Sequence, residues 1–165
     1  MAMQTDVNSY HAKVSGQIIG FESRIKSVVV ASATVSARQI ALCDSTGDLS
    51  GTWSRSGTLV TVTTSVNHGL TTGNRVAIDF SSGSTIRDGV YEVTVTGLNT
   101  FEVTSVTSGT ASGTCVVILP DNIILEIDTF STVSLPVLVP GQGIRCQNGI
   151  YAVLGASVTA TIYYG

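Results

Sequence analysis

The chain has little charge and no long apolar run. Charged residues make up 12% of its 165 residues, against roughly 25% in an average globular domain, and Ser, Thr, Gly and Asn supply the missing polarity. Free cytosolic enzymes usually stay soluble through surface charge, so this composition is more typical of a β-protein that packs in a large assembly. The longest apolar runs, 28–31 and 135–139, are far below the roughly 20 residues of a membrane span, and we expect no membrane contact.

Clustered basic residues are also lacking. The net charge is −3 and the eight Lys and Arg are scattered, whereas binding to nucleic acid by counterion release requires clusters. We therefore expect no nucleic-acid binding. The first residues lack the basic and then apolar segments of a signal peptide. Three cysteines without Cys-x-x-Cys spacing lie in or beside alternating apolar runs, which predicts buried thiols in a reducing compartment: Cys43, Cys115 and Cys146.

Alternation of apolar and polar residues predicts an all-β protein. The clearest strand is 157–164, where Val158, Ala160 and Ile162 alternate with polar or aromatic neighbours. The other runs outside the central segment are 14–21, 24–33, 38–43, 123–128, 133–139, 144–146 and 149–154. About eight short antiparallel strands imply a two-sheet β-sandwich of the jelly-roll type. The single helical signal is a turn or two near 6–12.

The central segment, 52–118, has the pattern of a second small protein set inside the first. Its alternating runs are 59–64, 75–80, 89–96, 100–104 and 114–118, with Ser-Gly-Thr triplets at 50–52, 56–58, 108–110 and 112–114. Closure into a small β-barrel would remove the exposed edges of such a short sheet. Neither flank has enough strands for a sandwich alone, so we expect one discontinuous sandwich domain from 13–48 and 119–165. Residues 1–12 form an N-terminal arm, and 46–48 and 119–121 have the composition of hinges.

No catalytic constellation accompanies these strands. His68 lies in an Asn-His-Gly turn without a clear nucleophile or orienting carboxylate, so a turn or packing role is expected, and His11 lacks companion zinc ligands. Three acidic pairs flank turns or share a strand face: Asp44 and Asp48, Asp79 and Asp88, and Glu126 and Asp128. Calcium would require further ligands, and turn formation explains these residues better. We expect no enzymatic activity, no metal and no cofactor.

Five aromatic residues are candidates for an interface, because exposed aromatic rings favour protein contacts or stacking against sugars. Core packing is the alternative for each of them. Trp53 stands where the central segment begins, and the last two tyrosines point to opposite faces of the final strand. The candidates are Tyr10, Trp53, Tyr151, Tyr163 and Tyr164.

Two resemblances to phage proteins follow from longer motifs. Residues 57–118, with Asn67-His-Gly-Leu-Thr-Thr-Gly-Asn-Arg-Val-Ala-Ile-Asp-Phe80 and Asn99-Thr-Phe-Glu-Val-Thr104, resemble a small β-barrel module of many tailed-bacteriophage virion proteins. This module is similar to the first catalytic cysteine half-domain of ubiquitin-activating enzymes. The flanks, with Pro140-Gly-Gln-Gly-Ile-Arg-Cys-Gln-Asn-Gly-Ile-Tyr151 and Val158-Thr-Ala-Thr-Ile-Tyr-Tyr-Gly165, resemble short structural proteins of podovirus-like marine and cyanobacterial phages.

The resemblance implies a non-enzymatic virion component that is assembled in the host cytoplasm. We expect a capsid decoration or cement protein that binds the major capsid protein or other virion proteins. A homo-oligomer is expected, with a trimer as the assumed symmetry. The alternative is a tail-associated or fibre-like module that binds a host receptor or glycan, which requires aromatic and polar side chains on a concave face.

Overall fold

The structure is a computed structural model that describes residues 7–34, 38–80, 86–129, 132 and 134–165. These residues form antiparallel strands in three sheets, and the only helical element among them is the 3-10 turn η1 (Pro120–Asn122). The all-β prediction is confirmed. Within the described residues there is also no helix of the length and apolarity that crossing a membrane requires.

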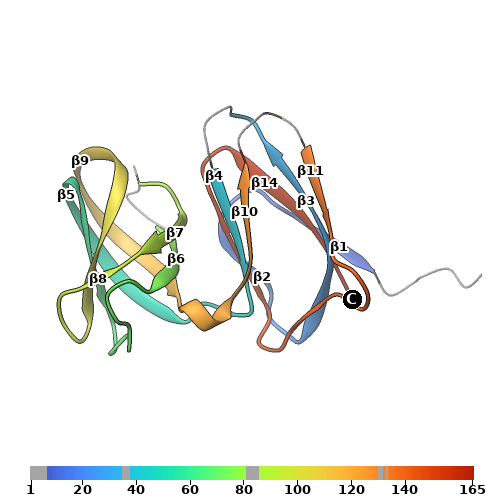
Figure 1. Ribbon diagram of the computed structural model, residues 1–165, viewed down its shortest axis with the longest axis horizontal. Helices are drawn as coiled ribbons and strands as arrows, with labels where there is room; N and C mark the ends of the chain where they lie inside the picture. Colours follow the sequence, from blue (N-terminus) through green and yellow to red (C-terminus); the bar gives the residue numbers. More distant parts are fainter. Residues whose placement is uncertain (1–6, 35–37, 81–85, 130–131, 133) are drawn as a thin grey trace, which may run out of the picture.

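Two of the sheets face each other and form a sandwich (Figure 1). Strand bounds confirm most of the predicted runs to within two or three residues. The first sheet has the order β1 (Asn8–Ala12), β14 (Val158–Tyr164), β3 (Ser23–Ser32) and β11 (Ser134–Leu138), and β12 (Ile144–Cys146) also pairs with β3. The second has the order β10 (Ile123–Thr129), β4 (Arg38–Cys43), β13 (Ile150–Leu154) and β2 (Gly16–Ile19).

The connections of these strands have jelly-roll topology. The strands β1, β2, β3 and β4 alternate between the two sheets, and the strands from β10 to β14 alternate in the same way when β11 and β12 are counted as one broken strand. The exception is the step from β4 to β10, which are paired neighbours in the second sheet. The central segment is inserted into this single hairpin.

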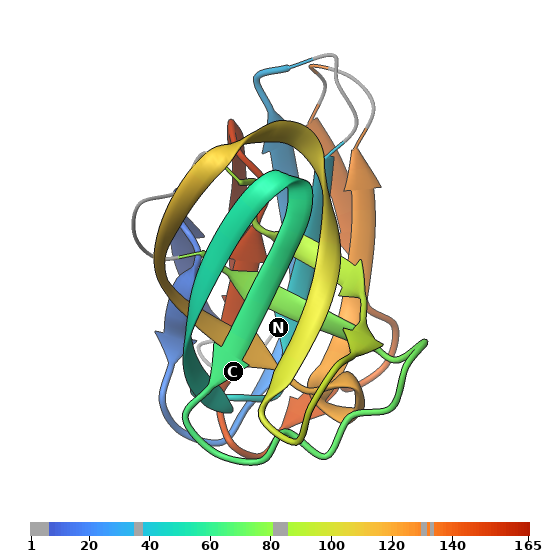
Figure 2. The same ribbon diagram turned by 90° about the vertical axis from the view of Figure 1, so that its left-hand side faces the viewer.

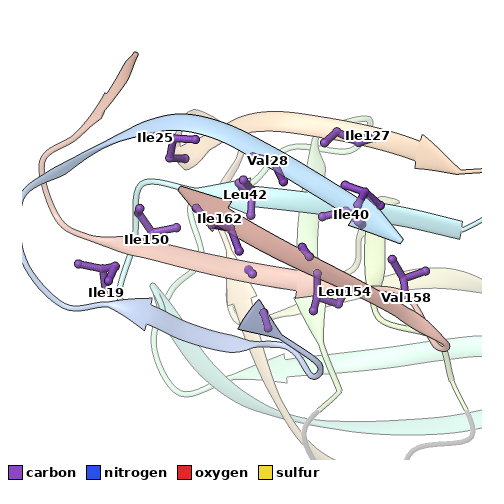
Figure 3. Packing of buried hydrophobic residues seen from close by; sticks show 14 of the residues in the cluster. Ile19, Ile25, Val28, Ile40, Leu42, Ile127, Ile150, Leu154, Val158 and Ile162 are labelled. Atoms are coloured by element: carbon purple, nitrogen blue, oxygen red, sulfur yellow. The ribbon is translucent and has the colours of Figure 1, made fainter. Parts of the chain in front are cut away.

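The sandwich core lies between the two sheets (Figure 3). On β14 the alternating set Val158, Ala160 and Ile162 is buried, which confirms the face that the sequence predicts. Ile40 and Leu42 of β4 are also fully buried. Each fully buried branched side chain of this kind contributes roughly 1.5–3 kcal/mol of transfer free energy.

The inserted module contains a third sheet with the order β5-β9-β6-β7, with β8 paired to β9. Its strands are β5 (Leu49–Thr64), β6 (Arg75–Asp79), β7 (Gly89–Glu92), β8 (Thr94–Val95) and β9 (Thr100–Ile118). The order has two ends, so the described residues form an open sheet, and the expected barrel closure is wrong. The long β5–β9 ribbon curves over instead (Figure 2). The ribbon encloses the core because the two halves of each long strand contribute to one apolar cluster.

A register shift accompanies the bend of this ribbon. Gly57 pairs with Gly109, but the next pair joins Leu59 to Thr104, so β9 carries additional residues at this point. Such bulges bend a strand and increase its twist. Beyond the bend, Val60 and Phe101 lie in the same apolar cluster as Trp53 from before it. The Ser-Gly-Thr triplets therefore lie inside β5 and β9 rather than around the module.

The N-terminal strand replaces the helical turn expected near 6–12. Residues Asn8–Ala12 pair with β14 along the edge of the first sheet. The unpaired backbone groups of that edge favour an added strand, and this outweighs the weak capping signal in the sequence. Of the two residues that could cap such a turn, Asn8 lies in β1, and Asp6 lies outside the described residues.

Candidate functional site

The module packs against the outer face of the second sandwich sheet. Ala41 of β4 and Val153 of β13 point away from the sandwich core and join Ala77, Val90 and Ile118 of the module in one buried apolar cluster. Because β4 and β13 are therefore covered on both faces, they form the middle layer of the molecule. The sandwich and the module meet in a packed junction.

Two carboxylates, the buried Asp79 and the half-buried Asp88, form hydrogen bonds across this junction. The Tyr151 hydroxyl of the sandwich donates to Asp79 of the module at 2.7 Å, and the Ser15 hydroxyl donates to Asp88 at 2.7 Å. The Phe80 N–H donates to the second oxygen of Asp88 at 2.9 Å. Burial raises the pKa of Asp79 and of Asp88, while these donors oppose the increase. Burial, followed by the hydrogen bond to Asp79, raises the pKa of Tyr151 above its usual range.

Two further carboxylates hold the segments in which the chain passes between the two domains. The first crossing is the segment 44–48 between β4 and β5, and the second is the segment 119–122 between β9 and β10. Asp48, in the first crossing, accepts hydrogen bonds from the Leu119 N–H at 2.7 Å and from the Asn122 amide at 2.9 Å, both in the second crossing. Asp44 accepts the N–H groups of Gln147 and Asn148 at 2.9 and 2.7 Å. The sequence predicts a role in the local turn for this acidic pair, whereas these hydrogen bonds join it to segments that are distant in sequence. In the ranges that the structure describes, no three His, Cys, Asp or Glu residues are grouped for metal binding.

The histidines have the roles expected of them. His68 is 5% exposed, its Nδ1 accepts the Leu70 N–H at 2.9 Å, and its Nε2 lies 3.1 Å from the Gly97 carbonyl. These partners require the tautomer with the proton on Nε2. His11 is exposed on β1 and contacts the Thr161 hydroxyl at 2.9 Å. The packing and surface roles are confirmed.

An open groove of about 630 Å³ lies at the junction. Both domains line it: β4 and β10 contribute from the sandwich, and the segment from residue 87 to 94 and part of β9 contribute from the module. The polar lining side chains are Arg38, Gln39, Arg87, Asp88, Glu92, Thr94, Thr104 and Asp128, and Tyr91 and Val106 add apolar surface. The groove exists only because the module is docked on the sandwich.

Hydrogen bonds hold the wall of the groove in place. The Gln39 side chain accepts the Val90 N–H of β7 at 3.3 Å and donates to Glu126 at 3.3 Å. Glu126 also forms an ion pair with Arg75 of the module at 2.6 Å. The Tyr91 hydroxyl donates to the Arg87 carbonyl, and burial raises the pKa of Tyr91 to about 12. Polar groups from both domains are thus fixed before any ligand binds.

The two arginines of the groove come from different domains. The Arg38 Nε donates to the Ala156 carbonyl at 3.0 Å. Partial burial and the nearby positive charge of Arg87 lower the pKa of Arg38. Guanidinium groups donate in a planar fork that fits carboxylates, phosphates and vicinal hydroxyls. Together with the acceptors Glu92 and Asp128, which are exposed at this site, the arrangement can bind a polar ligand.

The five candidate aromatic residues separate into two groups. Trp53 is 2% exposed in the module core, where it packs edge-on against Phe80, and Tyr151 is 6% exposed at the junction. An external partner cannot reach these two side chains, because Trp53 lies inside the module and Tyr151 is covered by it. The prediction that they could form an interface is therefore wrong for both. Tyr10 is 44% exposed, and Tyr163 and Tyr164 are half-buried. The role of these three as an interface stays a prediction.

The comparisons with known proteins give little guidance. No family model matches this chain, and no curated protein matches it. Among solved structures, the phage phi92 endosialidase is similar at 18% sequence identity and a TM-score of 0.31, over 85% of this chain and 22% of that chain. The chain therefore spans about a fifth of the endosialidase. A TM-score this low supports no conclusion about fold, activity or ligand.

Proposed function

We propose that this chain is a non-enzymatic, tail-associated or fibre-like module of a phage virion, and that its groove binds a host-surface saccharide. The phage assignment rests on the sequence motifs described above. The groove carries the rest of the proposal: it is concave, lies between two domains and presents polar side chains beside Tyr91, which are the features of a ligand site. Jelly rolls occur in both capsid and lectin domains, so the fold alone favours neither role.

Capsid decoration is less well supported than tail association. A decoration protein needs a broad face that stays buried against the shell, and a preformed polar groove has no use in such a contact. The outward face of the first sandwich sheet lies opposite the module (Figure 1) and is available for attachment to the rest of the virion. In this arrangement the sandwich is the anchor and the junction faces the host.

Adsorption of the purified, fluorescently labelled protein to host cells tests the proposal. Val106 lines the groove and is 72% exposed, so Val106→Trp should fill the groove without disturbing the core. Leu98 is 77% exposed and does not line the groove, so Leu98→Trp is the matched control. Wild type and L98W should bind cells and their extracted polysaccharide, and V106W should not. Equal binding by both variants, or no binding by the wild type, would overturn the proposal.

The number of copies per virion distinguishes the two virion roles. Quantitative mass spectrometry of purified particles should give a dozen or fewer copies of the chain, the order expected for a tail component built by cyclic symmetry. Hundreds of copies would favour the capsid shell instead.

A further inference from the structure

The strand β1 is an edge that the described part of the fold leaves open. It stands at the end of the first sheet, and among the residues that the structure describes its backbone pairs with β14 alone. Its residues from Asn8 to His11 are exposed. In an edge strand every second residue directs its N–H and C=O groups away from the sheet, where a further strand can pair with them. β1 therefore presents a row of unused hydrogen-bonding groups.

The other edges of the sandwich carry features that oppose such pairing. β11 contains Pro136, which has no N–H to donate. β10 contains the carboxylates Glu126 and Asp128, and β2 is only four residues long; charge and short length both protect an edge. β1 has the sequence Asn-Ser-Tyr-His-Ala, with no proline, lysine, arginine or carboxylate, and its register with β14 has no bulge.

Tyr10, at the centre of β1, has a ring that the fold covers only in part. It pairs with Ile162, whose side chain lies in the sandwich core, and facing residues of an antiparallel pair point to the same side of the sheet. Ile162 is fully buried, whereas Tyr10 is 44% exposed. A strand added at this edge would cover the open side of the ring.

We infer that β1 pairs in antiparallel orientation with β1 of a second copy of this chain, so that two sandwiches share one continuous sheet. Pairing along all five residues centres the two-fold axis on Tyr10, which then lies opposite its own copy. The other facing pairs are Ser9 with His11 and Asn8 with Ala12. A second copy is favoured over an unrelated strand because this pairing is self-complementary: it brings no like charges together and places the two half-covered rings side by side, and facing aromatic pairs are favourable.

The pairing gives a closed dimer, in place of the trimer assumed from the sequence. The two-fold axis of an antiparallel pair is perpendicular to the sheet, so both modules lie on one side of the joined sheet and both outward faces on the other (Figure 1). Pro136, at the far edge of each copy, opposes the addition of further strands. The inference goes beyond the proposed function and does not depend on it, although a dimer would present two grooves and so increase avidity.

Size-exclusion chromatography with multi-angle light scattering tests the inference on the whole chain. Small interfaces are typical of weak complexes, so the series runs from about 10 µM to about 1 mM protein, and the wild type should reach twice the chain mass of 17.1 kDa. Tyr10→Lys places two ammonium groups opposite each other and should raise the dissociation constant at least about tenfold. The matched control is Phe21→Lys, which replaces a 64% exposed ring in the turn between β2 and β3 and should dimerise as the wild type does.

A cysteine at the centre of β1 tests the register without depending on affinity. Facing Cα atoms of antiparallel strands are about 4.5–5.5 Å apart, which is within the range of a disulfide, and the three native cysteines are buried. Under mild oxidation Tyr10→Cys should form a covalent dimer, and Phe21→Cys should not. A wild type that stays monomeric or forms trimers, equal dimerisation of Y10K and F21K, or equal cross-linking of the two cysteine variants would overturn the inference. The proposed function, which is tested by adsorption to cells, would be unaffected.

Discussion

Replacing Tyr151 with phenylalanine removes one oxygen atom from the junction. The Asp79 carboxylate, which is 6% exposed, then loses the donor that lies 2.7 Å away. A hydrogen bond to a charged group contributes about 1.5–3 kcal/mol, and one between neutral groups about 0.5–1.5 kcal/mol. We therefore expect Tyr151→Phe to lower the free energy of unfolding by about 2 kcal/mol at pH 7.

The partner substitution isolates the contribution of the charge. In Asp79→Asn the amide oxygen still accepts from Tyr151, but the buried negative charge is absent. Adding Tyr151→Phe to this background should therefore cost only about 1 kcal/mol. The difference of about 1 kcal/mol between the two backgrounds is the coupling energy of a double-mutant cycle.

The pKa shifts of the two carboxylates determine whether the free energy of unfolding rises or falls with pH. Burial raises the pKa of Asp79 and Asp88 above their ordinary value of 3.8, so between 3.8 and the raised values the folded state binds more protons than the unfolded state. The stabilisation from these two groups is complete below pH 3.8 and is lost as the pH rises through their folded pKa values. The free energy of unfolding of D79N should therefore depend less steeply on pH than that of the wild type. The loss of stability that Y151F causes should become smaller as the pH falls.

Urea unfolding followed by two probes measures these quantities. Far-UV circular dichroism reports on all strands, and the fluorescence of Trp53, the single tryptophan, reports on the module core. Coincident transitions are expected in the wild type, because the junction couples the two domains. The reasoning is refuted if Y151F costs less than about 0.5 kcal/mol at pH 7 or costs the same in both backgrounds.

Three further substitutions and one chemical reaction test other parts of the fold. Asp48→Ala leaves the Leu119 N–H and the Asn122 amide without their acceptor and should cost about 2–3 kcal/mol in urea unfolding; a loss below 1 kcal/mol would contradict the role of the crossing. Gly149→Ala would place a Cβ 2.3 Å from a backbone oxygen at a φ of 128° and should cost about 2–4 kcal/mol. Gly57→Ala, at a φ of 66° in open space, should cost only about 1 kcal/mol, and equal losses would refute the steric argument. The three free cysteines are buried and burial raises their thiol pKa values, so Ellman's reagent should label none in native protein and three in urea.

The sandwich strands are predictable from sequence because each buries one face. The alternation in 157–164 corresponds to β14, and the predicted runs 38–43 and 144–146 coincide with β4 and β12. Turn residues are equally informative: Gly69 and Gly73 have φ values of 64° and 93°, as the Asn-His-Gly and Thr-Gly-Asn motifs require.

The rest of the module depends on strand pairing that cannot be recognised from the alternation of apolar and polar residues. The Ser-Gly-Thr segments of β5 and β9 carry few apolar residues, so they lack a strand signal, although Ser50 pairs with Val116 and Ser56 with Thr110. Barrel closure was a wrong expectation because the bend near Gly57 buries the apolar residues without joining the sheet edges.

The groove could not be predicted from local sequence. Arg38 belongs to the sandwich and Arg87 to the module, and only the docking of the two domains brings them to one site. Tyr151 shows the same limitation: its aromatic ring suggested an interface, and the contact it makes is internal to the chain.

The most direct test of the central claim is a nuclear magnetic resonance titration of the isotopically labelled protein with fragments of the polysaccharide extracted from host cells. The account predicts amide shift changes in the groove, at Gly89, Glu92, Thr94 and Thr104, which are absent in V106W. Shift changes confined to the outward face of the first sandwich sheet, or none at saturating saccharide, would contradict it.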